Sequence, residues 1–184
     1  MIFVIKTPTI LASIITGLSL FSPFPENQSF FLSPASATQT KQIIAQTSTI
    51  TEREIEEIIA ELTQAANNQN LAEISKYLAP EITIEMSLRS PTGSQNFIFN
   101  RDEYLFYLGE SFKTTKNYQQ TYDNLEIKVS PNGKTALATL NVTETGIVDE
   151  LKIFSTSEET ILFEIINDRI LITSVTANSN LEVR

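Results

Sequence analysis

The feature that most restricts the fold of this chain is a change of hydrophobic period at Pro80. Before this proline, Ile55, Ile59 and Leu62 recur at the spacing of one helical face. After it, apolar and polar residues alternate from residue 82 to 88, as in a strand with one buried face. Much of the later sequence keeps this period of two. Helices first and strands afterwards predict an α+β fold, in which helices cover one face of a curved antiparallel sheet.

Capping residues predict where three helices begin. Thr51 and Glu54 have the spacing of a capping box, in which each side chain accepts a hydrogen bond from the other residue's backbone N–H. Asn100 and Glu103 repeat this arrangement further along the chain. Asn70 is typical of the cap of a shorter helix between them. The sequence therefore predicts two helices before the first strand and one after the first hairpin.

Two more hairpins are predicted in the rest of the chain, because turn residues interrupt long runs of period two. The predicted strands are 118–130 and 135–147 around Asn132-Gly133, then 159–166 and 169–177 around Asn167-Asp168. Residues 147–157 have no predicted element, since Gly146 is consistent with either a bulge or a strand end.

The first 37 residues differ in composition from the rest. An apolar run from Ile10 to Phe21 follows a single Lys6 and precedes Ala35-Ser36-Ala37, the pattern of a secretory signal cleaved before Thr38. An uncleaved run would serve as a membrane anchor, although a spanning helix needs about 20 apolar residues.

We therefore expect an exported protein of a periplasmic or extracellular space, with a signal of bacterial type. Residues 38–50 are rich in Thr and Gln and predict a flexible lead-in. Residues 51–184 are enough for one compact domain. No stable membrane association is expected after cleavage.

The composition limits the chemistry. The chain has no Cys, so no disulfide can support the fold. It has no His, which is the commonest metal ligand and general base, and we expect neither a metal nor another cofactor. A net charge of −9 at pH 7 disfavours nucleic acids and anionic lipids as partners.

Three segments have the element order and apolar spacing of a known superfamily. They are AANNQNLAEISKYLAPEITIEM at 65–86, FNRDEYLFYLGESF at 99–112 and ILFEIINDRILITSV at 161–175. Through them the chain resembles, over residues 51–178, the nuclear transport factor 2-like (NTF2-like) superfamily, which includes ketosteroid isomerases and SnoaL-like polyketide cyclases. The resemblance implies a cone-shaped curved sheet with helices packed on its concave face. It does not imply one function.

At the catalytic positions of the ketosteroid isomerase branch, this chain has residues that cannot perform the same catalytic roles. In that branch the general base follows an acidic residue on the first strand, which places it on Met86 after Glu85. The oxyanion-hole tyrosine falls near Leu62, and the protonated acid of a later strand falls near Thr160. The resemblance therefore implies a binding or scaffolding member, and no catalytic residue is assigned.

Glu164 interrupts the apolar stretch before the last predicted turn. With a two-residue turn, the expected inward pairs are Ile165 with Ile170, Phe163 with Ile172 and Ile161 with Ser174. Glu164 then lies on the other face beside Arg169, as a partly exposed ion pair worth about 0.2–1 kcal/mol. The alternative is a catalytic acid in a pocket. Glu85 is a second alternative acid. The strand period turns it away from the core, but a strand at the mouth of the cone can present either face to the cavity.

Tyr77, Tyr104 and Tyr107, together with Met86, are the candidates for a ligand pocket. A phenol presents an apolar ring and a hydroxyl that can meet a ligand. The alternative is packing in the core, with the hydroxyl bonded to backbone or water.

The last strands carry a second set of apolar residues on the face opposite the first. Its members are Leu162, Ile166, Leu171 and Val175. One layer of helices can cover only one face, so the sheet of a partner subunit is the simplest cover for the other. We therefore expect a homodimer through the sheet.

The leading functional prediction is an exported, non-catalytic domain that binds a small apolar ligand or a protein partner. The alternatives are an isomerase, dehydratase or hydrolase that uses Tyr and Glu in the cone, and a structural oligomerisation module. The interior of the cone separates them. A void of a few hundred Å³ with a carboxylate and a tyrosine favours the enzyme, an apolar void favours the binder, and a filled cone favours the module.

Overall fold

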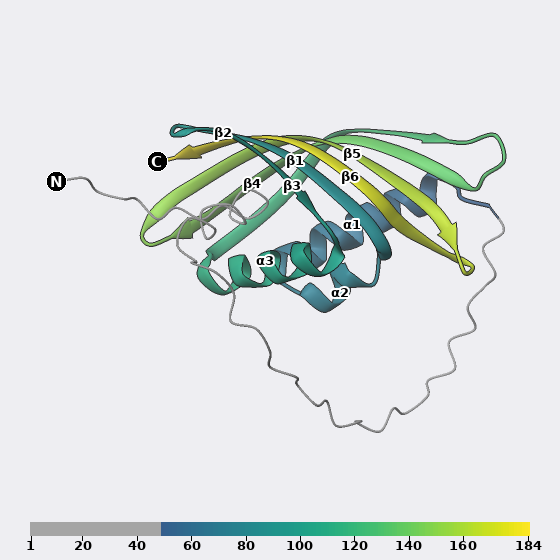
Figure 1. The fold of residues 1–184 in the computed structure, drawn as a ribbon, viewed down its shortest axis with the longest axis horizontal. Coiled ribbons are helices and arrows are strands. Elements are labelled where there is room, and N and C mark those ends of the chain that lie inside the picture. The colour runs from purple at the N-terminus through teal and green to yellow at the C-terminus, as the bar shows by residue number, and fades with distance from the viewer. Residues whose placement is uncertain (1–48) are drawn as a thin grey trace, which may run out of the picture.

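The computed structural model describes residues 49–184, which form a curved six-stranded sheet with three helices against one face (Figure 1). The helices are α1 (Glu52–Asn67), α2 (Leu71–Ser75) and α3 (Arg101–Thr114). The strands are β1 (Leu78–Ser90), β2 (Gly93–Phe99), β3 (Lys116–Val129), β4 (Thr135–Val148), β5 (Leu151–Ile166) and β6 (Arg169–Val183). The predicted signal, 1–37, and most of the predicted lead-in lie outside the described residues.

The strand order is β2-β1-β6-β5-β4-β3. Neighbouring strands are antiparallel except β1 and β6, which run parallel. The predicted α+β class and the curved sheet with helices on one face are confirmed, but the sheet is mixed rather than wholly antiparallel. The reason is that no hairpin joins β1 to β6, so no tight turn imposes an antiparallel direction on this pair.

All three predicted helix starts are confirmed. The backbone N–H of Glu54 donates to Thr51 Oγ1 at 3.3 Å, and that of Thr51 donates to Glu54 Oε2 at 2.9 Å. Asn100 and Glu103 form the same box at the start of α3, and Asn70 caps α2. No helix within residues 49–184 is both long and apolar enough to cross a membrane.

Two tight turns set the register of the last three strands. The turn at 167–168 has φ angles of 50° and 59°, and the turn at 149–150 has φ angles of 47° and 71°. Positive φ at both central residues gives the twist that antiparallel strands prefer. The second turn explains residues 147–157, for which the sequence predicted no element. Strand β4 continues through Gly146, which is neither a bulge nor a strand end.

The predicted register of β5 and β6 holds only as far as a bulge at Thr173. The first two predicted pairs are confirmed, but Ile161 then stands opposite Val175 rather than Ser174. A shift of one residue reverses the face of every side chain beyond it. The bulge therefore turns Val175 toward the helices. The prediction that Val175 lies on the outer face is wrong.

The hydrophobic core lies between the helices and the inner face of the sheet. Ile55 of α1 and Phe163 of β5 are fully buried there, and Ile59 is 3% exposed. These are the inward residues predicted from the helical and strand periods. A cavity beside this core holds the candidate site.

Candidate site in the cone

A cavity of about 100 Å³ lies between the helices and the inner face of the sheet. All three helices and every strand except β2 contribute to its wall, which is mostly apolar. Within residues 49–184, neither Lys nor Arg lines it. The ionisable residues in its wall are Glu144 of β4, Glu159 of β5, Tyr104 of α3 and Tyr118 of β3.

The strand period places both carboxylates inward. On β4 the side chains of Leu140 and Val142 face the core, and Glu144 is the next residue on the same face. On β5 the alternation that buries Phe163 continues back to Glu159. Glu144 is 4% exposed and Glu159 is 8% exposed. Two acidic groups therefore share a largely apolar interior.

Glu144 is held by the first residues of β3. Tyr118 Oη donates to Glu144 Oε1 at 2.8 Å and lies 3.2 Å from Gln120 Oε1. Burial raises the pKa of Tyr118, and the nearby Glu144 raises it further. The phenol therefore keeps its proton at neutral pH and remains a hydrogen-bond donor.

Glu159 has one bonded and one free carboxyl oxygen. Ser157 Oγ donates to Glu159 Oε1 at 2.9 Å, while Oε2 makes no hydrogen bond to the described residues. Burial raises the pKa of Glu159 above its usual 4.5, and the hydrogen bond from Ser157 opposes this shift in part. A buried carboxyl group with an unbonded oxygen is available to a molecule in the cavity.

Tyr104 brings a second free polar group from the helix layer. Its hydroxyl makes no hydrogen bond to residues 49–184. Burial raises the pKa of Tyr104, and so do Glu159 and Glu144. Tyr104 lines the same cavity as both carboxylates. Its phenol can donate to a ligand between them.

Replacing Tyr118 with phenylalanine should destabilise the protein by about 1–3 kcal/mol, because a buried hydrogen bond to Glu144 is lost. Urea denaturation measures this change. Tyr122→Phe on the same strand is the matched control, since the Tyr122 hydroxyl makes no hydrogen bond to the described residues. Equal midpoints for the two variants would show that the Tyr118 hydrogen bond contributes no stability.

The structure separates the residues predicted to form a ligand pocket. Tyr104 lines the cavity, whereas Tyr77, Met86 and Tyr107 do not. Met86 is 1% exposed within the hydrophobic core. The Tyr107 ring packs against Phe99, with 5.6 Å between ring centroids.

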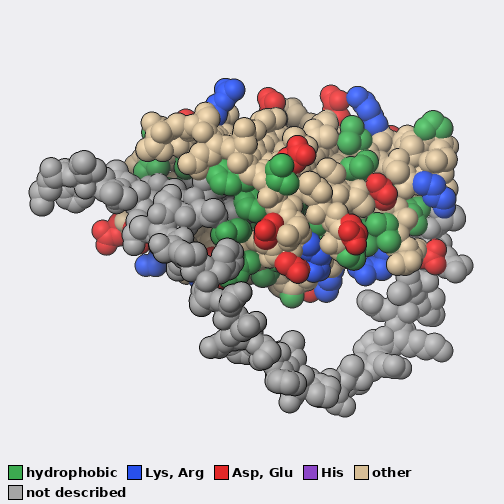
Figure 2. All heavy atoms as spheres, in the orientation of Figure 1, with side chains coloured by type: hydrophobic (Ala, Val, Ile, Leu, Met, Phe, Trp, Pro, Cys, Tyr) green, Lys and Arg blue, Asp and Glu red, His purple; other side chains and the backbone are tan. Residues whose placement is uncertain are grey.

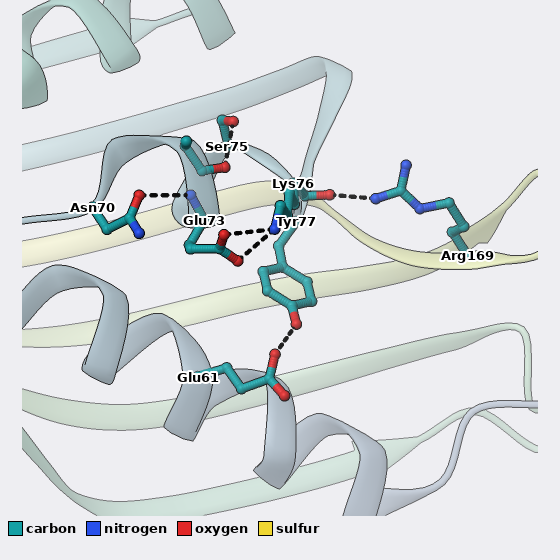
Figure 3. A network of polar contacts seen from close by, with 8 residues as sticks. Glu61, Asn70, Glu73, Ser75, Lys76, Tyr77 and Arg169 are labelled. Carbon is teal, nitrogen blue, oxygen red and sulfur yellow. Dashed lines mark hydrogen bonds and ion pairs between the residues drawn. The ribbon is translucent and has the colours of Figure 1, made fainter. Parts of the chain in front are cut away.

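Tyr77 belongs instead to a polar network that connects the helices with the end of the sheet (Figure 3). Its hydroxyl donates to Glu61 Oε2 on α1. Burial raises the pKa of Tyr77, and the hydrogen bond to Glu61 raises it further, to about 12. In the same network Arg169 Nη2 donates to the backbone carbonyl of Lys76 at 2.7 Å, which anchors the β5–β6 turn beside α2 (Figure 3).

The predicted ion pair of Glu164 and Arg169 is wrong. Glu164 Oε1 accepts from Thr173 Oγ1 at 3.1 Å, because the bulge brings that hydroxyl beside it. Arg169 is engaged by the Lys76 carbonyl. Glu164 faces away from the cavity, and Glu85 is exposed on the outer face of β1. The two alternative acids are therefore apart from the cavity and from each other.

Sequence reasoning missed Glu144, Glu159 and Tyr118, although the signal for the two carboxylates was available. The alternation of 136–142 extends to Glu144, and the alternation of 161–165 extends back to Glu159. The resemblance placed a protonated acid near Thr160. Thr160 itself is exposed, and the inward residue at this point is its neighbour Glu159.

The outer face of the sheet is more polar than the sequence suggested. Val175 lines the cavity, and Leu171 is 7% exposed without any partner subunit. Leu162 pairs across strands with Leu137, which is 37% exposed, and these two form the main apolar contact of this face on β4 and β5. Beyond them one cross-strand row is Glu126, Thr139, Thr160, Thr176, Glu85 and Ile98, of which Ile98 is 71% exposed. The next row is Asp123, Asn141, Glu158, Asn178, Ser87 and Asn96.

The comparisons with known proteins identify the fold. No protein-family model and no curated protein matches the chain. Among solved structures, an NTF2-like superfamily protein from Salmonella enterica is 21% identical, covers 68% of this chain and 87% of its own, and has a TM-score of 0.52. An NTF2-like protein of unknown function from Pseudomonas putida is 14% identical, with coverages of 69% and 84% and a TM-score of 0.54. A type 2 hexachlorocyclohexane dehydrochlorinase (LinA) is 10% identical, with coverages of 71% and 86% and a TM-score of 0.55.

The described domain therefore has the NTF2-like fold. Its structural neighbours are NTF2-like and SnoaL-like proteins, and they include an enzyme as well as a protein of unknown function. At these identities the likeness concerns the fold alone. Function has to be argued from the cone.

Proposed function

We propose that this domain performs acid/base chemistry on a small molecule held in the cone, with Glu159 as the group that carries the proton. The observation behind the proposal is a buried carboxyl group that has a raised pKa and a free oxygen in a cavity. Such a group can hold a proton nearer to neutral pH than an exposed glutamate and can exchange it with a bound molecule.

The neighbouring groups have supporting roles. Tyr118 and Tyr104 keep their protons because burial raises the pKa of each phenol, so both can donate hydrogen bonds in the cavity. The hydrogen bond from Tyr118 orients Glu144. The largely apolar wall lowers the local dielectric and strengthens each of these interactions.

Non-catalytic binding of a small apolar ligand or of a protein partner is the second candidate function. The largely apolar wall supports binding, and the volume of about 100 Å³ is below the few hundred Å³ expected of an enzyme pocket. Glu159 favours catalysis, because binding an apolar ligand gives no reason to bury a carboxyl group with a free oxygen.

Proton exchange with solvent tests the proposal. The protein is incubated in deuterated water with small carbonyl compounds, and deuterium entering the C–H positions next to the carbonyl group is followed by proton NMR. We expect exchange in compounds that bind, and its loss in Glu159→Gln. Binding of these compounds without exchange would favour the non-catalytic function, and exchange unaffected by Glu159→Gln would exclude Glu159 as the proton carrier.

Export is a further proposal, supported by the sequence of residues 1–37. The protein recovered from the extracytoplasmic fraction should begin at Thr38 when its N-terminus is sequenced. Retention of Met1 or of the apolar run would contradict cleavage.

A homodimer through the sheet is also a proposal, now restricted to the contact of Leu137 and Leu162. Leu162→Glu should convert a dimer to a monomer in sedimentation velocity, because it places a charge in the apolar part of the contact. Ala72→Glu, on the exposed side of α2, is the control and should leave the dimer intact. A monomeric wild-type protein would contradict the proposal.

A further inference from the structure

We propose that the cone takes a small organic cation, an amine or a quaternary ammonium ion of about four or five heavy atoms. This inference rests on the proposed function in one respect, since it concerns the same cavity. It goes further by specifying the charge, size and chemical class of the ligand.

The charges of the wall are the first argument. Two buried carboxyl groups face the cavity, and none of the side chains that the described part of the chain contributes to its wall is basic. A carboxylate or phosphate ligand would meet charge of its own sign at low dielectric, which is costly. A neutral apolar ligand would leave Glu159 Oε2 unpaired. A cation pairs with this oxygen by charge, and a protonated amine also donates a hydrogen bond to it.

The aromatic rings of the wall are the second argument. Tyr104, Phe112 and Tyr118 all line the cavity. The rings of Phe112 and Tyr118 lie 5.9 Å apart at an interplanar angle of 52°, so they form two differently oriented walls. The faces of such rings attract ammonium groups, most strongly where water is excluded. Rings and carboxylates together resemble the surroundings in which proteins hold alkylated ammonium ions.

The volume limits the size of the cation. An apolar cavity of roughly 150 Å³ accommodates benzene. A cavity of about 100 Å³ is smaller, so it limits the ligand to a compact group of a few heavy atoms such as trimethylammonium. The protein as a whole also attracts cations, because the chain has a net charge of −9 and acidic side chains are spread over the face seen in Figure 2.

A metal ion fits the wall less well. Residues 49–184 contain no group of three or more acidic side chains placed to hold one. Hard cations such as Ca²⁺ need about six to eight oxygen ligands, whereas this wall is mostly apolar. An organic cation is desolvated more readily and uses the rings as well.

Binding of the cation should depend on pH through Glu159. Its titratable neighbours in the cavity are Glu144 on β4, Tyr118 on β3 and Tyr104 on α3, while α1, α2, β1 and β6 contribute no charged side chain to the wall. A bound cation favours the ionised form of Glu159 and therefore lowers its pKa. By linkage, affinity rises with pH until Glu159 is ionised in the free protein.

Isothermal titration calorimetry of the purified protein with tetramethylammonium, tert-butanol, acetate and CaCl₂ tests the inference. We expect tetramethylammonium to bind about tenfold more tightly near pH 8 than near pH 5. The uncharged tert-butanol, of similar size, should bind at least about tenfold more weakly, and acetate should not bind. Failure of tetramethylammonium to bind, equal binding of tert-butanol, or displacement by CaCl₂ would each overturn the inference.

Two variants separate the contributions of charge and ring. Glu159→Gln should remove the pH dependence, with Glu158→Gln on the outer face as the matched control. Phe112→Leu keeps apolar bulk and should weaken tetramethylammonium but not tert-butanol, which provides a test if the glutamine variant folds poorly. Affinity for tetramethylammonium unchanged in both variants would overturn the inference.

The outcomes are independent of those for the proposed function. Cation binding without proton exchange on any bound compound would uphold the ligand class and remove the catalytic proposal. Proton exchange on neutral compounds, with no binding of tetramethylammonium, would uphold the catalytic proposal and remove the ligand class.

Discussion

Replacing Glu159 with glutamine is expected to lower proton-transfer turnover in the cone by about 10²–10⁴-fold, the usual contribution of a positioned acid or base. Glutamine keeps the size of the side chain and can still accept from Ser157, but it has no proton to exchange. The initial rate of deuterium incorporation into a bound compound measures the loss. The rate should fall without a comparable change in the compound's affinity if that compound is uncharged.

Glu158→Gln is the matched control for this variant. Glu158 is the preceding residue on β5, but the strand period turns it to the exposed outer face. The control removes the same charge from the chain and leaves the cavity unchanged. Equal rates in the two variants would mean that long-range charge, not the position of Glu159, accounts for the effect.

The same variant has a consequence for stability. Because burial raises the pKa of Glu159, the folded protein holds this proton more tightly than the unfolded chain does. The resulting stability is fully present below the usual pKa of 4.5 and is lost as pH rises through the folded-state pKa. Glutamine cannot ionise. The unfolding free energy of Glu159→Gln should therefore rise relative to that of wild type as pH increases from 4.5 through the folded-state pKa, and then level off. Parallel pH profiles would contradict the shift.

Local signals in the sequence predicted the elements of the fold well. Thr51 and Asn100 start helices because their side chains satisfy backbone N–H groups a few residues away, and that chemistry is contained in four consecutive residues. The turn at 167–168 is equally local. These features depend on neighbours in the chain, so one sequence is enough to recognise them.

Features that depend on distant contacts were not predictable in the same way. The parallel pairing of β1 with β6 joins segments far apart in the sequence. The bulge at Thr173 inserts one residue and turns Val175 inward, and no residue type in 161–175 marks it. Arg169 donates a hydrogen bond to the carbonyl of Lys76, which is far away in the sequence. The local sequence of the hairpin had predicted an ion pair of Arg169 with Glu164 instead.

The candidate site was missed for a different reason. Glu144 and Glu159 occupy inward positions of regular strands, which the period of two does identify. The sequence analysis assigned neither of them a role, although both lie within predicted strands, 135–147 and 159–166. An acidic residue in the buried phase of a strand violates the usual pattern, and such violations concentrate at functional sites.

Replacing Phe163 with alanine should cost about 3–5 kcal/mol of unfolding free energy, the usual effect of removing a buried aromatic ring. Phe163 is fully buried, and its cross-strand neighbours on the inner face are Ala136 of β4 and Ile172 of β6. The methyl group of Ala136 cannot fill the space, so the void should persist. Urea denaturation should show a much lower midpoint with little change in slope.

Leu162→Ala is the matched control, because Leu162 is the preceding residue on β5 and lies half-buried on the outer face. Its smaller contact area should make its loss cost clearly less than that of Phe163. If the two variants had the same midpoint, the face of β5 assigned to the core would be wrong. The inward placement of Glu159 would then fail as well, because Glu159 and Phe163 share one phase of the same strand. This measurement of stability therefore also tests the geometry on which the candidate site depends.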